Sequence, residues 1–156
     1  MIKKESDILW SIIHFDDLST IQLFDILYLR TEVFVVEQDC PYQEVDEKDK
    51  KALHVMAYTK GNELLAVARI LPPGISYKEL SFGRVAVKMT YRGKGLGDLL
   101  TSKLTDYIHL RFPKENIRIS AQSHLNKFYE KHGFKQVSEE YDEDGIPHIE
   151  MLRLAD

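Results

Sequence analysis

The stretch "GRVAVKMTYRGKGLGDLL" (residues 83–100) contains the transition on which the fold prediction depends. Its apolar residues Val85 to Val87 are typical of a β-strand, and its later leucines recur at helical spacing. Three glycines and two cations lie between these halves. The pattern predicts a strand that passes to a helix through an open, positively charged turn.

Such a turn suits an anion. The first N–H groups of a helix have no partner within the helix, and the helix dipole places partial positive charge there. Phosphate is a natural ligand at this position. Glycine lets the backbone approach a ligand closely because it has no Cβ, and Arg92 and Lys94 add formal charge. The residues therefore predict a phosphate or pyrophosphate site.

Two common phosphate motifs do not match the turn. The P-loop requires a Lys-[Ser/Thr] pair after its glycines, and none follows here. The dinucleotide fingerprint requires a third glycine where this sequence has Leu100. A glycine-rich turn without a ligand stays open on the residues alone, since turns use glycine heavily.

The composition indicates an ordinary globular protein. The chain has 156 residues, of which 44% are apolar and 29% charged, so we expect one domain over residues 1–156. The net charge of −4 argues against general affinity for nucleic acid. No apolar run is long enough to span a membrane, and no signal peptide is recognisable. The single cysteine, Cys40, fits a reducing cytoplasm.

The remaining pattern predicts an α/β or α+β fold. We expect "YQEVDEKDKKA" (residues 42–52) to be an exposed, solvated loop. The segment with helix 96–112 at its centre should form a parallel, right-handed strand-helix-strand unit. The expected strands are 8–15, 53–59, 63–71, 82–88, 116–122 and two within 134–154, and the expected helices are 16–38, 96–112 and 123–132.

Several motifs together resemble the GNAT superfamily of N-acyltransferases. Arg92-x-x-Gly95-x-Gly97 matches its [Gln/Arg]-x-x-Gly-x-[Gly/Ala] signature, and "LNKFYEKHGF" (residues 125–134) is similar to its tyrosine-bearing segment. "LRTEVFVVEQDCPY", "GRVAV" and "GIPHIEM" resemble the ElaA-like branch. The resemblance implies a mixed, mostly antiparallel sheet with one splayed parallel strand pair and helices on both faces.

The resemblance also implies a binding site for acetyl-CoA, or a related acyl-CoA, as co-substrate. Backbone N–H groups of the turn would hold the pyrophosphate, and the edge of the preceding strand would bind the pantetheine arm and polarise the thioester carbonyl. Gln122 stands where many members carry an asparagine that binds pantetheine. The implied cofactor-binding residues are Val85, Ala86, Val87, Arg92, Gly93, Lys94, Gly95, Leu96, Gly97, Asp98 and Gln122.

The implied reaction is N-acetylation of a small-molecule or protein amine, which attacks the thioester directly. Tyr129 matches the general acid that protonates the CoA thiolate. The strand "NIRIS" offers no carboxylate for a base, so the candidates are His148, with Glu37 as the alternative and His54 as a third, or else water. The six histidines show no zinc-binding spacing, so no metal is implied.

Two other functions stay open. The fold could hold acyl-CoA as a ligand without turnover. "LRTEVF", "VDEKD" and "ARILPP" also resemble acyl-homoserine lactone synthases, although the tryptophan those enzymes carry is missing. Dimers are common among GNAT relatives, and a homodimer is therefore an alternative to a monomer.

Overall fold

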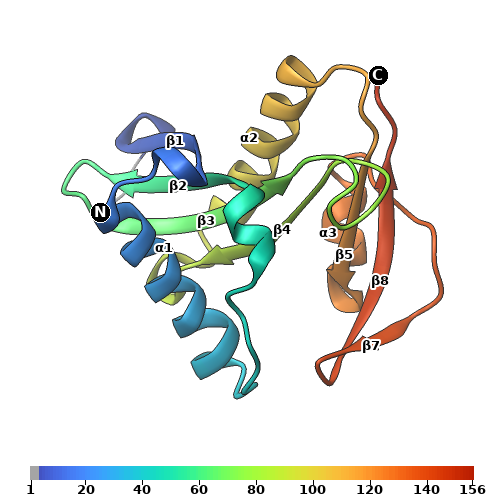
Figure 1. Ribbon diagram of the computed structural model, residues 1–156, viewed down its shortest axis with the longest axis horizontal. Coiled ribbons are helices and arrows are strands. Elements are labelled where there is room, and N and C mark those ends of the chain that lie inside the picture. The colour runs from blue at the N-terminus through green and yellow to red at the C-terminus, as the bar shows by residue number, and fades with distance from the viewer. Residues whose placement is uncertain (1–3) are drawn as a thin grey trace. The chain divides into compact units, whose positions relative to one another are not determined.

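A computed structural model describes residues 4–156 (Figure 1). The chain divides into two compact units, the first made of residues up to Ile70 with Arg84–Leu100 and the second of Leu71–Gly83 with Thr101–Asp156. No helix among the described residues is both long and apolar enough to cross a membrane. The elements are β1 (Ile8–His14), α1 (Thr20–Thr31), β2 (Leu53–Thr59), β3 (Leu64–Leu71), β4 (Ser81–Val87), α2 (Leu96–Arg111), β5 (Ile117–Gln122), α3 (Asn126–Glu130), β6 (Lys135–Gln136), β7 (Tyr141–Glu143) and β8 (Ile146–Arg153).

The first unit is built on a sheet with the strand order β1-β2-β3-β4. β1 and β2 pair antiparallel from Ile8 opposite Thr59 to His14 opposite Leu53, and β2 and β3 form the predicted hairpin (Figure 1). All eight residues of β3 are buried. The sequence predicted these strands correctly because their β-branched and apolar residues suit a strand that is covered on its faces.

Helix α1 is shorter than the predicted helix 16–38. It begins with a capping box, in which Ser19 Oγ accepts from the Gln22 N–H and Gln22 Oε1 accepts from the Ser19 N–H, at 3.1 and 2.9 Å. After Thr31 the chain continues as a π-helix over Glu32–Glu37. The core of this unit contains Ile26, Leu29, Val33, Met56, Leu64, Val67 and Ala86.

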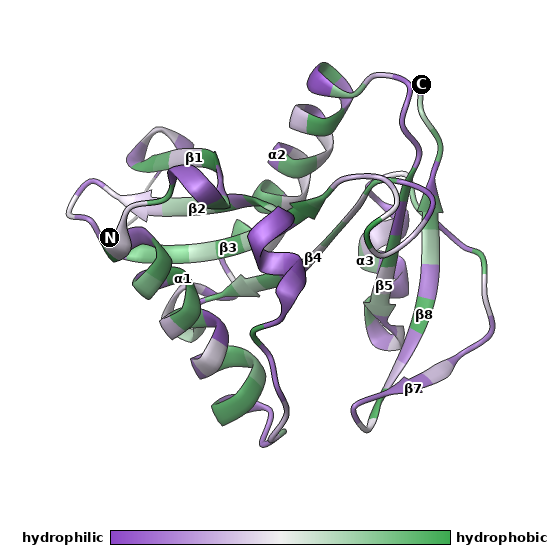
Figure 2. Cartoon of the chain, viewed as in Figure 1, coloured by the Kyte–Doolittle hydropathy of each residue, from purple (hydrophilic) through white to green (hydrophobic). Residues whose placement is uncertain are grey.

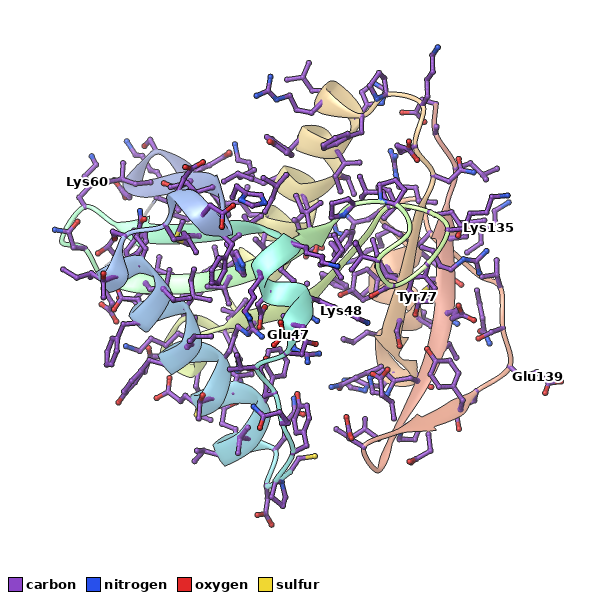
Figure 3. The ribbon with its side chains drawn as sticks, viewed as in Figure 1. Glu47, Lys48, Lys60, Tyr77, Lys135 and Glu139 are labelled. Carbon is purple, nitrogen blue, oxygen red and sulfur yellow. The ribbon has the colours of Figure 1, made fainter. Side chains whose placement is uncertain are left out.

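The acidic run was predicted incorrectly as a solvated loop. Residues Glu47–Lys51 form a 3₁₀ helix, which Figure 2 shows in purple as strongly hydrophilic. Glu47 and Lys48 are exposed or half-exposed on it (Figure 3), but Asp49 is buried, as is Glu44 just before it. The physical reason is ion pairing with buried arginines that lie far away in the sequence.

The second unit contains a sheet with the strand order β5-β8-β6, and β7 also pairs with β8. The turn at Asp144 and Gly145 joins β7 to β8, as predicted, while the short β6 was not expected. The C-cap of α3 is Lys131 and not the predicted Gly133, which follows two residues later with a φ of +88° and donates its N–H to the Glu130 carbonyl oxygen at 3.0 Å. A parallel bridge links Leu80 to Ile117, and β4 and β5 belong to different sheets.

Candidate functional site

The glycine turn has the backbone conformation that its sequence predicts. Gly93 and Gly95 have φ values of +75° and +79°, in the left-handed region that favours glycine, and α2 begins at Leu96. Apart from its two neighbours in the chain, a Cβ added at either glycine would meet no heavy atom of residues 4–156 within 4 Å. The space beside both glycines is therefore open, and the amino end of a 16-residue helix adjoins it. A ligand can approach this backbone directly.

The two cations of the turn have different partners. Arg92 Nη2 lies 2.7 Å from Glu37 Oε2, and Arg92 Nε donates to the Val87 carbonyl oxygen at 2.9 Å. Lys94 contacts neutral groups: its Nζ is 3.4 Å from the Thr90 carbonyl oxygen and 5.4 Å from the centroid of the Tyr91 ring. Glu37 thus opposes the charge of Arg92, whereas the ammonium of Lys94 contributes its charge to the turn.

Strand β4 places the predicted pantetheine-binding backbone directly before the turn. Val85, Ala86 and Val87 occupy its last three positions, and Ala86 is buried in the core. Arg84 precedes them with a φ of +50°, which is uncommon for a residue other than glycine. The sequence did not predict this conformation, because arginine carries no signal for it.

A buried ion network surrounds Arg84 in the first unit. Asp49 accepts from Arg30 Nη1 at 2.7 Å and from Arg69 Nη1 at 2.9 Å. Glu44 Oε1 lies 2.8 Å from both Arg30 Nε and Arg84 Nε. Burial alone would raise the pKa of Asp49, but hydrogen bonds and charge from Arg30, then Arg69, hold it at about 2.

Sequence reasoning missed this network, although two local signals pointed to it. Arg30 lies in an apolar helix and is 1% exposed, and Arg69 lies in the fully buried strand β3. A buried arginine requires a partner, so an acidic run elsewhere in the chain was the natural candidate. His54 belongs to the same region: its Nε2 is 2.9 Å from the Asp49 carbonyl oxygen, and burial lowers its pKa.

Tyr129 is enclosed by aromatic rings in the second unit. Its ring centroid lies 5.1 Å from that of Phe128, 5.8 Å from Phe134 and 6.4 Å from Phe82, and its side chain is buried. Burial raises the pKa of Tyr129 to about 12. The phenol is therefore protonated at neutral pH and can donate its proton or a hydrogen bond.

His148 has acceptors at both ring nitrogens. Nδ1 lies 2.7 Å from the Ile146 carbonyl oxygen and Nε2 lies 3.0 Å from Glu143 Oε2. The ring satisfies both acceptors only when each nitrogen carries a proton. Gln122, the last residue of β5, lies opposite His148 in the strand register.

The second unit also contains a cluster of hydroxyl groups, from Ser120, Tyr141 and Tyr77, that the sequence did not predict. Ser120 Oγ and Tyr141 OH are 2.5 Å apart, and the Tyr141 ring stacks on that of His148 at 6.3 Å. Burial, followed by the nearby Tyr141 and acidic groups, raises the pKa of Tyr77 to about 12; Figure 3 labels this residue. No group of three or more His, Cys, Asp or Glu within residues 4–156 could hold a metal ion.

The comparison with protein families now defines the class of this protein. A family model described as Acetyltransferase (GNAT) domain matches residues 17–154. The chain therefore belongs to the GNAT acetyltransferase family, which confirms the resemblance found in its motifs and the mixed α/β fold.

Within this family the chain is similar to Protein ElaA of Escherichia coli (strain K12), with 42% identity over 146 residues, 92% of this chain and 95% of that protein. The crystal structure of Escherichia coli ElaA gives a TM-score of 0.87 at 40% identity, covering 94% of this chain and 99% of the other. The crystal structure of an acyl-CoA N-acyltransferase from Pseudomonas aeruginosa gives a TM-score of 0.89 at 42% identity, with the same coverage of both chains. The crystal structure of the AHL synthase LasI gives a TM-score of 0.77 at 14% identity, covering 96% of this chain and 90% of the other. An identity this low shows a shared fold alone. The protein is an acyltransferase of the ElaA-like branch.

Proposed function

We propose that this acyltransferase moves an acetyl group from acetyl-CoA to a primary amine by direct attack of the amine on the thioester. The observation that carries the proposal is the turn at Gly93 and Gly95, with two positive φ values and open space beside both glycines. Its N–H groups, together with those of the first turn of α2, suit the pyrophosphate of CoA. The backbone of Val85 to Val87 would bind the pantetheine arm.

The cations have separate roles in this proposal. Lys94 faces neutral partners and adds attraction for the phosphates. Arg92 holds the Val87 carbonyl and Glu37 together, which ties the end of β4 to the π-helix. Leu96, Gly97 and Asp98 complete the cradle through backbone groups, and Gln122 remains a proposed contact to pantetheine.

Tyr129 is our proposed general acid. The thiolate that leaves needs a proton or a hydrogen bond, and the buried phenol keeps its proton at neutral pH. A phenol with a pKa of about 12 is a weaker acid than a thiol, whose pKa is roughly 8.5. Its first contribution is therefore a hydrogen bond to the developing thiolate, and full transfer requires the bound cofactor to change its surroundings.

The geometry favours water over His148 and Glu37 as the base. His148 has an acceptor at each nitrogen, and Glu37 is ion-paired with Arg92. A base needs an unprotonated atom directed at the amine. His148 Nε2 lies against a carboxylate oxygen of Glu143 at 3.0 Å, so we propose that water accepts the proton.

The wider setting is also a proposal. We propose that residues 1–156 act as one acyltransferase domain, because the family match extends over residues 17–154. We propose a cytoplasmic location, because the sequence has a single cysteine, Cys40, which fits a reducing compartment. The acyl-homoserine lactone alternative gains nothing from LasI, since a 14% identity shows only the fold.

The test is release of CoA thiol from acetyl-CoA across a panel of primary amines, with a mass measurement of the acetylated amine. The panel should include aliphatic and aromatic amines and lysine peptides, because α1 and the π-helix carry a hollow of about 490 Å³ with apolar, aromatic and acidic walls. Thiol release that depends on the amine supports transfer. Tight binding of acetyl-CoA with no release above the amine-free rate would instead favour the binding-module alternative.

A further inference from the structure

Arg84 has a strained backbone conformation in the middle of β4. Its φ of +50° lies in the left-handed region, where a residue with a Cβ is disfavoured. The alternation of buried and exposed side chains is interrupted there, since Gly83, Arg84 and Val85 are all partly buried in succession. Such strain persists only where the surrounding structure imposes it, and it is concentrated at functional sites.

The side chain of Arg84 is anchored by the segment that precedes the 3₁₀ helix. Its Nε lies 2.8 Å from Glu44 Oε1, and its Nη2 donates to the Glu44 carbonyl oxygen at 2.9 Å. Nη2 is also 3.5 Å from Asp46 Oδ2, and the guanidinium lies 5.9 Å from the centroid of the Tyr42 ring. Both the side chain and the main chain of Glu44 therefore hold this arginine.

The anchor is itself fixed from two other elements. Glu44 is 3% exposed, and Arg30 on α1 holds the same carboxylate oxygen that Arg84 contacts. Arg30 and Arg69 both hold Asp49, and Arg69 also pairs with Asp46. Helix α1, strand β3 and the 44–49 segment are thus joined by charge-assisted contacts around one arginine of β4.

We propose that Glu44 and Arg84 are positioning residues, which together hold the left-handed backbone at Arg84 and so set the direction of the N–H groups that follow it on β4. The inference rests on the proposed function, in which the backbone of Val85 to Val87 binds acyl-CoA and polarises its carbonyl. Neither side chain is assigned a contact with the reacting atoms. A small error in such a donor's position is costly, because catalysis depends on hydrogen bonds aimed at the transition state.

The test compares Arg84→Ala with Arg84→Gly. Both remove the guanidinium, but glycine adopts a positive φ without strain and alanine does not. We expect kcat to fall by about 100-fold in Arg84→Ala and by about tenfold in Arg84→Gly, with KM for acetyl-CoA within about threefold of the parent. Glu44→Gln introduced into the parent should lower kcat. The same substitution introduced into Arg84→Gly should not lower kcat further, because Glu44 acts through the Arg84 side chain.

The matched control is Lys50→Gln, which breaks an exposed ion pair with Glu47 on the neighbouring 3₁₀ helix. Its kcat should equal that of the parent. Equal losses in Arg84→Ala and Arg84→Gly, or an additive effect of Glu44→Gln, would overturn the proposal.

Amide hydrogen exchange, followed by NMR without any cofactor, separates this inference from the proposed function. We expect exchange at Val85 and Ala86 to be faster in folded Glu44→Gln and in Arg84→Ala than in the parent, and unchanged in Lys50→Gln. Unchanged exchange in both anchor variants contradicts the positioning role, whether or not the parent transfers acetyl. Loss of transfer across the amine panel, with the expected exchange rates, contradicts the proposed function alone.

Discussion

Asp49 should make folding stability depend on pH in a specific acidic range. Its carboxylate accepts from Arg30 and Arg69 at 2.7 to 3.0 Å, and these arginines hold its pKa at about 2 against the burial that would raise it. The ordinary value is 3.8. Each unit by which the pKa of Asp49 is lowered contributes about 1.4 kcal/mol, so the shift from 3.8 to about 2 corresponds to about 2 kcal/mol of folding stability at neutral pH.

The direction in which folding stability changes with pH follows from the lowered pKa of Asp49. The ionised carboxylate binds more favourably in the folded protein, so its contribution is complete above the unfolded value of 3.8 and is lost as pH falls through about 2. At pH 3 about half of it should be gone. Asp49→Asn should cost about 3 to 5 kcal/mol at pH 7, because it leaves buried arginines undercompensated.

The assay is urea unfolding of the parent and Asp49→Asn at pH 7, 5 and 3. The stability gap is the difference in the free energy of unfolding between the two proteins. We expect it to be the same at pH 7 and at pH 5, and to be smaller by about 1 kcal/mol at pH 3. Both proteins should carry His54→Gln, because burial lowers the pKa of His54, the charge of Asp49 works against that shift, and the titration of His54 would otherwise differ between them. Glu47→Gln, on the exposed side of the same 3₁₀ helix, should change stability by less than about 1 kcal/mol. A gap that does not depend on pH, or a cost below about 1 kcal/mol at pH 7, would refute this reasoning.

Three further variants test the second unit. Tyr129→Phe keeps the buried ring and should lower kcat about 100-fold with acetyl-CoA affinity nearly unchanged; an unaltered kcat in the thiol assay would remove Tyr129 as the acid. His148→Gln should leave kcat within about threefold, because both ring nitrogens already have acceptors; a loss of 100-fold, recovered at higher pH, would establish His148 as the base. Phe134→Ala should cost about 3 to 5 kcal/mol in urea unfolding, since this ring is 1% exposed and packs against Phe82 and Tyr129; a cost below about 1 kcal/mol would contradict the packing described.

The parts of the fold that depend on local sequence were predictable. Ser19 and Gln22 form a capping box within one helical turn, and Gly133 takes a positive φ just after α3. The turn at Gly93 and Gly95 was predictable for the same reason, because its conformation is set by the glycines themselves.

The ion network was not predictable in this way. Its contacts join residues that are far apart in the sequence, such as Arg84 and Glu44, and hydropathy alone marks an acidic run as exposed. The π-helix after Thr31 and the positive φ of Arg84 were missed because no residue type signals either. Both depend on tertiary contacts that a local pattern does not contain.

Calorimetric titration of acetyl-CoA into the parent, Gly95→Ala and Gly74→Ala tests the central claim most directly. Gly74 and Gly95 have similar φ values, +87° and +79°, and among the described residues an added Cβ meets only chain neighbours within 4 Å at either one. Both variants therefore carry the same backbone strain of about 1 to 2 kcal/mol, but only Gly95 belongs to the turn. We predict that Gly74→Ala binds acetyl-CoA as the parent does and that Gly95→Ala binds at least about tenfold more weakly. Equal binding by all three proteins, or no binding by the parent, would contradict a cofactor site at this turn.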